Sequence, residues 1–185
     1  MSERTIRLVR HGRAVAGWGD SVDPDLDAGG RHQATELARR LAATPVSEIV
    51  SSPLRRCRAT AQPLAALTGL DVEVDPALAE IPHPPDVDLG GRADWLRSVM
   101  EGEWTDLDDR LVAYRAGVVA AVRSLSDGAV AFSHFVAINA VIGACLGDDR
   151  LLLRRLDHAS VTTVTVADTG MWLVLGGAEG HTDVR

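Results

Sequence analysis

The stretch Leu8-Val9-Arg10-His11-Gly12-Arg13 decides how the rest of the chain is interpreted. It predicts that a buried strand over residues 5–9 leads straight into two arginines, a histidine and a glycine. Arginine is always charged, and a neutral imidazole carries a nucleophilic lone pair. The cluster therefore favours an anion held beside a nucleophile, and we expect phosphoryl transfer through His11.

The composition predicts one domain over residues 1–185, because the chain is long enough to bury a core and has 46% apolar and 24% charged residues. No apolar run approaches the roughly 20 residues needed to span a bilayer. The start of the chain also lacks the pattern of a signal peptide. Cys57 and Cys145 have no metal-type spacing and are expected to be reduced thiols. We therefore expect a cytoplasmic protein.

A formal net charge of −7 argues against nucleic acid or an anionic membrane as partner. It leaves a small anionic substrate open, since one cation at 4 Å attracts an anion by roughly 4 kcal/mol at an effective dielectric of 20. Since we expect phosphoryl transfer through His11, such a substrate would be a small phosphorylated molecule. The oligomeric state is left open, with a homodimer as one alternative.

Apolar periodicity predicts strands that alternate with helices along the whole chain. The expected strands cover residues 5–9, 48–51, 71–74, 128–133, 161–166 and 172–175, and the expected helices cover 30–43, 53–68, 95–100, 107–125 and 135–146. Ser52 is the expected N-cap of the second helix, and Pro63 inside it predicts a kink or a break. This alternation predicts a three-layer α/β/α sandwich with a mostly parallel sheet. Residues 81–104 give weak signals and are expected to cap the substrate pocket.

Three predicted strands end in polar residues, at 10–12, at 51–52 and at 133–134. Ligands of open parallel sheets bind outside the carboxyl ends of the strands, so these ends are expected to share one crevice. Helices that begin after Ser52 and Ser133 would point their positive N-termini toward it. Arg56 lies in the first turn of one of these helices and is expected to reach the crevice.

These residues match a known family in five places. The matches are Arg10-His11-Gly12, Leu26 to Ala34, Ser51 to Arg56, Leu78-Ala79-Glu80 and Ser133-His134, with weaker support from Ala159 to Thr162 and from His181. In this order they resemble the histidine phosphatase superfamily, which includes the cofactor-dependent phosphoglycerate mutases. The resemblance runs from the first strand almost to the end of the chain.

The resemblance implies a role for each matched residue. His11 would be the nucleophile that forms a phosphohistidine, and Glu80 would first protonate the leaving alcohol and then activate water. Arg10, Arg56 and His134 would hold the phosphate oxygens. These cations replace a metal, so no metal and no other cofactor are expected. Gly12 and Arg13 are further candidates for substrate binding.

The chain departs from the family pattern after the first triplet, where Arg13, Ala14 and Gly17 stand in place of Glu or Gln, of Ser or Thr, and of Asn. Whether Arg13 replaces the missing Asn contact is left open. The residues after Glu80 also differ from the glycine and tryptophan that many members carry. These departures leave the expected chemistry intact and the substrate undetermined.

Several other residues have a structural explanation. His32 and His158 are expected to be structural or exposed, His83 to lie in a surface loop, and Trp18, Trp95 and Trp104 to pack in the core or a lid, while His181 is undecided. The spacing of Asp23, Asp25 and Asp27 fails the EF-hand pattern, which requires glycine at its sixth and glutamate at its twelfth position.

We predict a metal-independent phosphomonoesterase from these observations. The alternatives are a phosphoglycerate mutase-type phosphotransferase, a phosphohistidine protein phosphatase and a non-catalytic phospholigand-binding module. The short segment around the site argues against the mutase, since mutases are generally longer. Retention of His11, His134 and Glu80 argues against the binding module.

Overall fold

The computed structural model describes residues 3–17 and 20–180. In this part of the chain one sheet has the strand order β3-β2-β4-β1-β5-β6. Its strands are β1 (Arg4–Arg10), β2 (Ile49–Ser51), β3 (Val72–Val74), β4 (Val130–Ser133), β5 (Val161–Ala167) and β6 (Gly170–Leu175). The first four are parallel, while β5 pairs antiparallel with β1 and β6 pairs antiparallel with β5. The expected mostly parallel sheet is confirmed.

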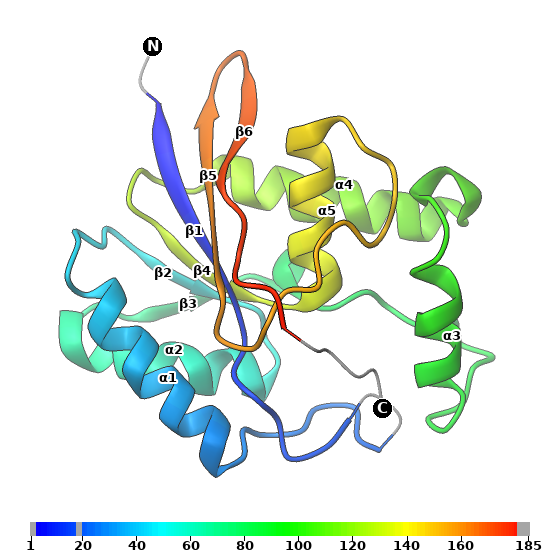
Figure 1. Cartoon of the computed structure of the whole chain (residues 1–185), viewed down its shortest axis with the longest axis horizontal. Helices are drawn as coiled ribbons and strands as arrows, with labels where there is room; N and C mark the ends of the chain where they lie inside the picture. The colour runs from blue at the N-terminus through cyan, green and yellow to red at the C-terminus, as the bar shows by residue number, and fades with distance from the viewer. Residues whose placement is uncertain (1–2, 18–19, 181–185) are drawn as a thin grey trace.

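Helices cover both faces of the sheet. Helices α1 (Ala28–Leu41) and α2 (Arg55–Thr68) lie on one face, and α4 (Asp109–Ser124) and α5 (Phe135–Leu146) lie on the other (Figure 1). Helix α3 (Arg92–Val99) stands apart from the sheet, on the side of α4 and α5, and two 3-10 turns cover Pro76–Leu78 and Trp104–Asp106. The three-layer α/β/α prediction is confirmed.

The alternation of side chains along β4 shows why both faces are covered. Val130 and Phe132 pack against α1 and α2, whereas Ala129 and Ala131 belong to the core beneath α4 and α5. All four are fully buried. A strand that is apolar on both faces is stable only between two layers of helices.

Local polar residues fix the helix ends. The Asp27 carboxylate accepts from Gly30 N at the start of α1, and that of Asp108 accepts from Leu111 N at the start of α4. Gly69 ends α2 in the left-handed conformation, with φ of 73°, which suits a residue without a Cβ atom. The helices begin and end within a few residues of the expected boundaries.

The structure contradicts two expectations for α2, the Ser52 cap and a break at Pro63. Ser52 does not cap the helix, which begins at Arg55, because its hydroxyl lies 2.7 Å from His134 Nε2 and the Asp23 carboxylate accepts from Arg55 N. Pro63 does not break the helix, which runs without interruption through it. The proline lies on the partly exposed side, where water can reach the Ala59 carbonyl that loses its partner.

The thiols of Cys57 and Cys145 are both free, as expected. Among the described residues no helix is long and apolar enough to cross a membrane.

The register of the sheet brings three strand ends to one level. Arg10 at the end of β1 pairs with Ser133 at the end of β4, and Ser51 at the end of β2 pairs with Phe132. The polar residues that follow these strands therefore meet at one edge of the sheet, as the sequence predicts.

Candidate active site

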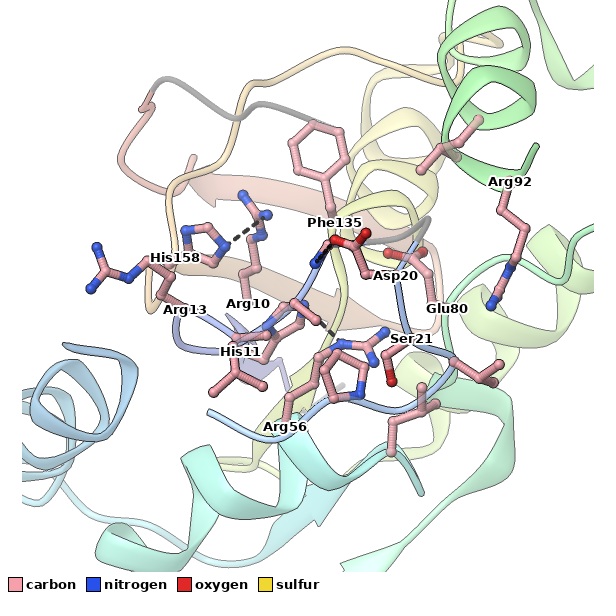
Figure 2. Close-up of a pocket in the computed structure, with 18 of the residues that line it drawn as sticks. Arg10, His11, Arg13, Asp20, Ser21, Arg56, Glu80, Arg92, Phe135 and His158 are labelled. Atoms are coloured by element: carbon pink, nitrogen blue, oxygen red, sulfur yellow. Dashed lines mark hydrogen bonds between the residues drawn. The ribbon is translucent and has the colours of Figure 1, made fainter. Parts of the chain in front are cut away.

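A cavity of about 640 Å³ lies at the carboxyl ends of β1, β2 and β4 (Figure 2). Polar residues from these strand ends form one side of it. Apolar side chains form much of the rest, among them Val15 and Ile81 from loops, Leu96 from α3 and Phe135 from α5. The volume exceeds what a single phosphate group fills and is typical of a site for a small organic ligand.

His11 lies in the wall of the cavity and is only 8% exposed. Its Nδ1 atom lies 2.8 Å from the Gly12 carbonyl oxygen, so Nδ1 carries the proton and donates it. The lone pair of the ring is then on Nε2. Burial lowers the pKa of His11 well below its usual value, and the charges of Arg56 and Arg10 lower it further. His11 is therefore a neutral imidazole with a defined tautomer.

Arg10 and Arg56 flank His11 and are each 5% exposed. The Arg56 Nε–H donates to His11 Nε2 over 3.2 Å, and Asp23 lies 3.9 Å from the same guanidinium. The guanidinium of Arg10 donates to the Leu156 carbonyl oxygen and stands over the Phe135 ring, 5.0 Å from its centre. Two cations are thus fixed on either side of the imidazole (Figure 2).

Glu80 lines the same cavity from the segment that follows the Pro76–Leu78 turn. One of its carboxylate oxygens accepts from Ile81 N over 3.0 Å. Burial raises the pKa of the Glu80 carboxyl above its usual value, while this backbone bond and the charges of Arg56 and Arg10 oppose the shift. A carboxyl with a raised pKa can carry a proton near neutral pH.

His134 lies behind His11, with the two ring centres 5.2 Å apart and the rings edge to face. It is fully buried and does not line the cavity. Its Nε2 atom lies 2.7 Å from Ser52 Oγ and 3.3 Å from Cys57 Sγ. Burial, more than the charge of Arg56, lowers its pKa well below the usual value. His134 is near the reacting group but faces the interior.

Gly12 and Arg13 contribute less to the cavity than the sequence suggests. The amide of Gly12 donates to Thr60 Oγ1 over 3.0 Å, and Gly12 packs against Gly30, whose carbonyl oxygen a Cβ atom would approach to 2.7 Å. The Arg13 side chain is 59% exposed at the rim and pairs with Asp27 over 2.6 Å. Gly12 allows the close approach of α1 to the end of β1.

His158 and Arg92 also line the cavity, although the sequence predicts no role for them there. His158, expected to be structural or exposed, lies with its ring centre 5.9 Å from that of His11 and its Nε2 3.2 Å from Arg10 Nη2. Burial and the charge of Arg10 lower its pKa to about 4. Arg92 reaches the cavity from α3 and is 8% exposed. The position of His158 directly before the matched tetrapeptide at Ala159 was the available signal, whereas Arg92 has no sequence signal.

The remaining candidates lie away from the cavity wall. His32 is exposed on α1, His83 is partly buried in its loop, and Trp104 is buried in the core. Trp18 and His181 lie outside the described residues. Asp25 pairs with Arg31 over 2.8 Å, so the aspartates of this loop serve arginines and helix starts.

The model of the histidine phosphatase superfamily (branch 1) matches residues 6–178. This chain belongs to that superfamily. The match covers both the strand ends that form the cavity and the antiparallel pair that closes the sheet.

Two relatives of this histidine phosphatase superfamily member carry the name probable phosphoglycerate mutase GpmB. The protein of Photorhabdus laumondii subsp. laumondii is 28% identical over 82% of this chain and 79% of its own length. The protein of Shigella boydii serotype 18 is 27% identical over 92% of this chain and 88% of its own length.

Solved structures share the fold of this superfamily member. A mycobacterial glucosyl-3-phosphoglycerate phosphatase in complex with VO3 aligns with a TM-score of 0.72 and 25% identity, over 95% of this chain and all of the other. The phosphoserine phosphatase of Entamoeba histolytica aligns with a TM-score of 0.69 and 19% identity, over 94% and 96% of the two chains. The names of these relatives are those of phosphatases and mutases, which both transfer phosphoryl groups.

Proposed function

We propose that this protein is a metal-independent phosphomonoesterase, which hydrolyses a small phosphorylated metabolite through a phosphohistidine on His11. The observation that carries the proposal is the state of the His11 ring. Its Nδ1–H is bound to the Gly12 carbonyl, its Nε2 lone pair accepts from Arg56, and Arg10 flanks the ring on the other side. A neutral nucleophile flanked by two fixed cations suits attack on a phosphate ester.

In the first step His11 Nε2 attacks phosphorus and the bond from phosphorus to the ester oxygen breaks. The leaving oxygen takes its proton from Glu80, whose pKa is raised by burial. Arg56 turns its Nε–H from His11 to a phosphate oxygen as the substrate enters. The guanidinium groups of Arg10 and Arg56 compensate the charge on the phosphate oxygens, which is the role a metal ion would otherwise fill.

In the second step water attacks the phosphohistidine and Glu80, now ionised, accepts a proton from it. The bond between Nε2 and phosphorus breaks and its electron pair returns to His11. We propose that His134 acts as a polar group beside His11. Donation to a phosphate oxygen requires that its ring leave the hydrogen bond with Ser52 Oγ.

Hydrolysis of p-nitrophenyl phosphate tests the proposal. We expect activity that persists in excess chelator and a phosphoenzyme that is acid-labile, as phosphohistidine is, when the reaction is quenched after mixing with labelled substrate. Absence of activity toward every phosphomonoester tested would contradict the proposal and favour a binding module. A phosphoenzyme that survives acid would assign the nucleophile to another residue.

A mutase remains the second candidate, because the relatives from P. laumondii and S. boydii are named as such. A mutase returns the phosphoryl group to the substrate, whereas a phosphatase gives it to water. Incubation with 3-phosphoglycerate separates the two. We expect free phosphate, and 2-phosphoglycerate as the main product would overturn the assignment.

Residues 81–104 favour a small substrate over a phosphohistidine protein. Ile81, Pro82 and Leu96 from this segment line the cavity, as does Phe135. A substrate group that reaches His11 must fit within this cavity. We propose that the segment caps the pocket.

A further inference from the structure

Arg92 is a cation of the cavity for which the proposed reaction has no use. It is the first residue of α3, its side chain is 8% exposed, and it lines the same cavity as His11. Figure 2 shows Glu80 between Arg92 and the group formed by His11 and Arg56. Arg92 therefore stands at the end of the cavity opposite the nucleophile.

The position of Arg92 is unfavourable for a cation in three respects. Its guanidinium is buried, it stands at the positive end of a helix, and the charge of Arg56 acts on it. Burial and the charge of Arg56 both lower the pKa of Arg92. An anion that enters the cavity beside the guanidinium offsets the unfavourable free energy of each of these effects.

Cations outnumber carboxylates among the described residues of the cavity wall. The cations are Arg10, Arg13, Arg56 and Arg92, and the carboxylates are Asp20 and Glu80. Burial raises the pKa of the Glu80 carboxyl, which disfavours its charged form. A substrate phosphate held by Arg10 and Arg56 makes no use of the charge of Arg92.

The space between the two ends fits a short substrate body. Ile81, Leu96 and Phe135 line it with apolar atoms. Arg56 and Arg92 line the same cavity. One small molecule can therefore contact both.

We propose that Arg92 binds a second anionic group of the substrate, a carboxylate or a second phosphate, while the ester phosphate lies against His11. The inference rests on the proposed phosphatase function and names its substrate class. It excludes phosphate esters with a neutral body, such as simple sugar or polyol phosphates, as preferred substrates.

A matched pair of substrates tests the inference. 3-Phosphoglycerate and glycerol 3-phosphate differ by a carboxylate in place of a hydroxymethyl group, and glycerol 1,3-bisphosphate offers a second phosphate. For the unaltered protein we expect kcat/KM to be at least tenfold higher for an acidic member of this set than for glycerol 3-phosphate. The acid or the bisphosphate, whichever is preferred, identifies the second group.

The variant Arg92→Gln should reduce this preference to within about twofold, chiefly through KM. The loss toward p-nitrophenyl phosphate should be several-fold smaller than the loss toward the preferred acidic substrate, since p-nitrophenyl phosphate has no second anion. Arg92→Lys should retain part of the preference because it keeps the charge. Arg97→Gln is the matched control on α3, since Arg97 is exposed and pairs with Asp94 over 2.7 Å.

Two outcomes would overturn the inference. One is an unaltered protein that hydrolyses glycerol 3-phosphate as well as the acidic substrates. The other is an Arg92→Gln variant that loses activity equally toward all of them, p-nitrophenyl phosphate included.

Calorimetric binding separates failure of the inference from failure of the proposed function. We expect His11→Ala to bind 3-phosphoglycerate or glycerol 1,3-bisphosphate more tightly than glycerol 3-phosphate, and the added Arg92→Gln change to abolish the difference. That result without catalysis in the unaltered protein would sink the phosphatase assignment and retain the anion site.

Discussion

The two ends of the cavity are built differently. At the phosphate end, the site of the proposed reaction, Arg10 is the last residue of a central strand, His11 follows it and Arg56 stands in the first turn of a packed helix. At the substrate end, Ile81 and Arg92 come from a segment in which only α3 is a regular helix of more than one turn. The first end is therefore built on the sheet, and the second on a segment with little regular structure. In the proposed function the reaction depends on this framework, and the choice of substrate depends on the cap.

The largest effect should come from the phosphate end itself. His11→Ala removes the nucleophile, and we expect the phosphatase rate to fall by about 10⁴-fold or more, since no other group can replace the covalent step. Steady-state hydrolysis of p-nitrophenyl phosphate measures the loss. His32→Ala, an exposed histidine on α1, is the control and should retain full activity. Comparable rates for the two variants would refute the mechanism.

Glu80 lies between the two ends and should show an effect that depends on the leaving group. Glu80→Gln cannot donate a proton, so we expect roughly 10²–10⁴-fold slower hydrolysis of alkyl phosphates. A nitrophenolate leaves without protonation, and its ester should be affected much less. A series of phosphate esters with graded alcohol pKa values measures this dependence. An equal loss across the series would assign the proton donor to another residue.

A single methyl group added at each end tests the difference in rigidity. A Cβ atom on Gly30 would lie 2.0 Å from the Arg13 carbonyl oxygen, whereas on Gly91 it would lie 3.2 Å from the end of the Asp88 side chain. We expect Gly30→Ala to lower the free energy of unfolding by about 1–3 kcal/mol, because backbone must move. Gly91→Ala should change it by less than about 0.5 kcal/mol. Urea unfolding of both variants measures the two free energies, and equal effects would show that the two ends do not differ in rigidity.

A smaller effect on activity is expected for His158, which we propose positions Arg10. Its Nε2 accepts from the Arg10 guanidinium, and the next residue, Ala159, has a φ of 56° and donates to the Arg10 carbonyl oxygen. We expect His158→Ala to reduce kcat/KM by roughly tenfold or more, since a hydrogen bond to a charged group contributes about 1.5–3 kcal/mol. The loss should vanish in an Arg10→Ala background, as a double-mutant cycle measures. Full additivity would show that His158 acts without Arg10.

The pKa of His158 also predicts how the folded state responds to acid. Because burial lowers this pKa to about 4, the unfolded chain binds a proton below about pH 6.5 that the native protein does not. The stabilisation is therefore complete above pH 6.5 and is lost as pH falls toward 4. His158→Gln keeps an acceptor but does not titrate, so the unfolding free energy should fall less steeply in this window, by up to about 1.4 kcal/mol per pH unit. An unchanged slope would contradict the assignment.

Much of the phosphate end could be predicted from the sequence, because its residues lie next to strongly patterned elements. The apolar run before Arg10 predicts a buried strand, and the polar residues after three such strands predict a shared crevice. Parallel strands bring their carboxyl ends together whatever the loops do. The structure brings Arg10, His11, Arg56 and Glu80 to one cavity, and their chemical roles remain proposals.

Predictions from local sequence patterns fail for residues whose partners are distant along the chain. Ser52 has the local pattern of a helix cap, but its hydroxyl is hydrogen-bonded to His134. The first amide of the helix donates instead to Asp23 from a distant loop. His158 was expected to be structural or exposed, since its place before the matched tetrapeptide does not by itself indicate a contact with Arg10. Each case depends on a contact between segments that only folding brings together.

The sequence by itself determined the sheet, the nucleophile candidate and the family, because periodicity and short motifs act over a few neighbouring residues. Only the tertiary structure decided that His134 faces the interior, that His158 contacts Arg10 and that Arg92 enters the cavity. The physical reason is that the orientation and burial of a side chain depend on the segments packed against it. Local propensity determines whether Arg92 begins a helix, while the packing of that helix determines that its charge faces the cavity.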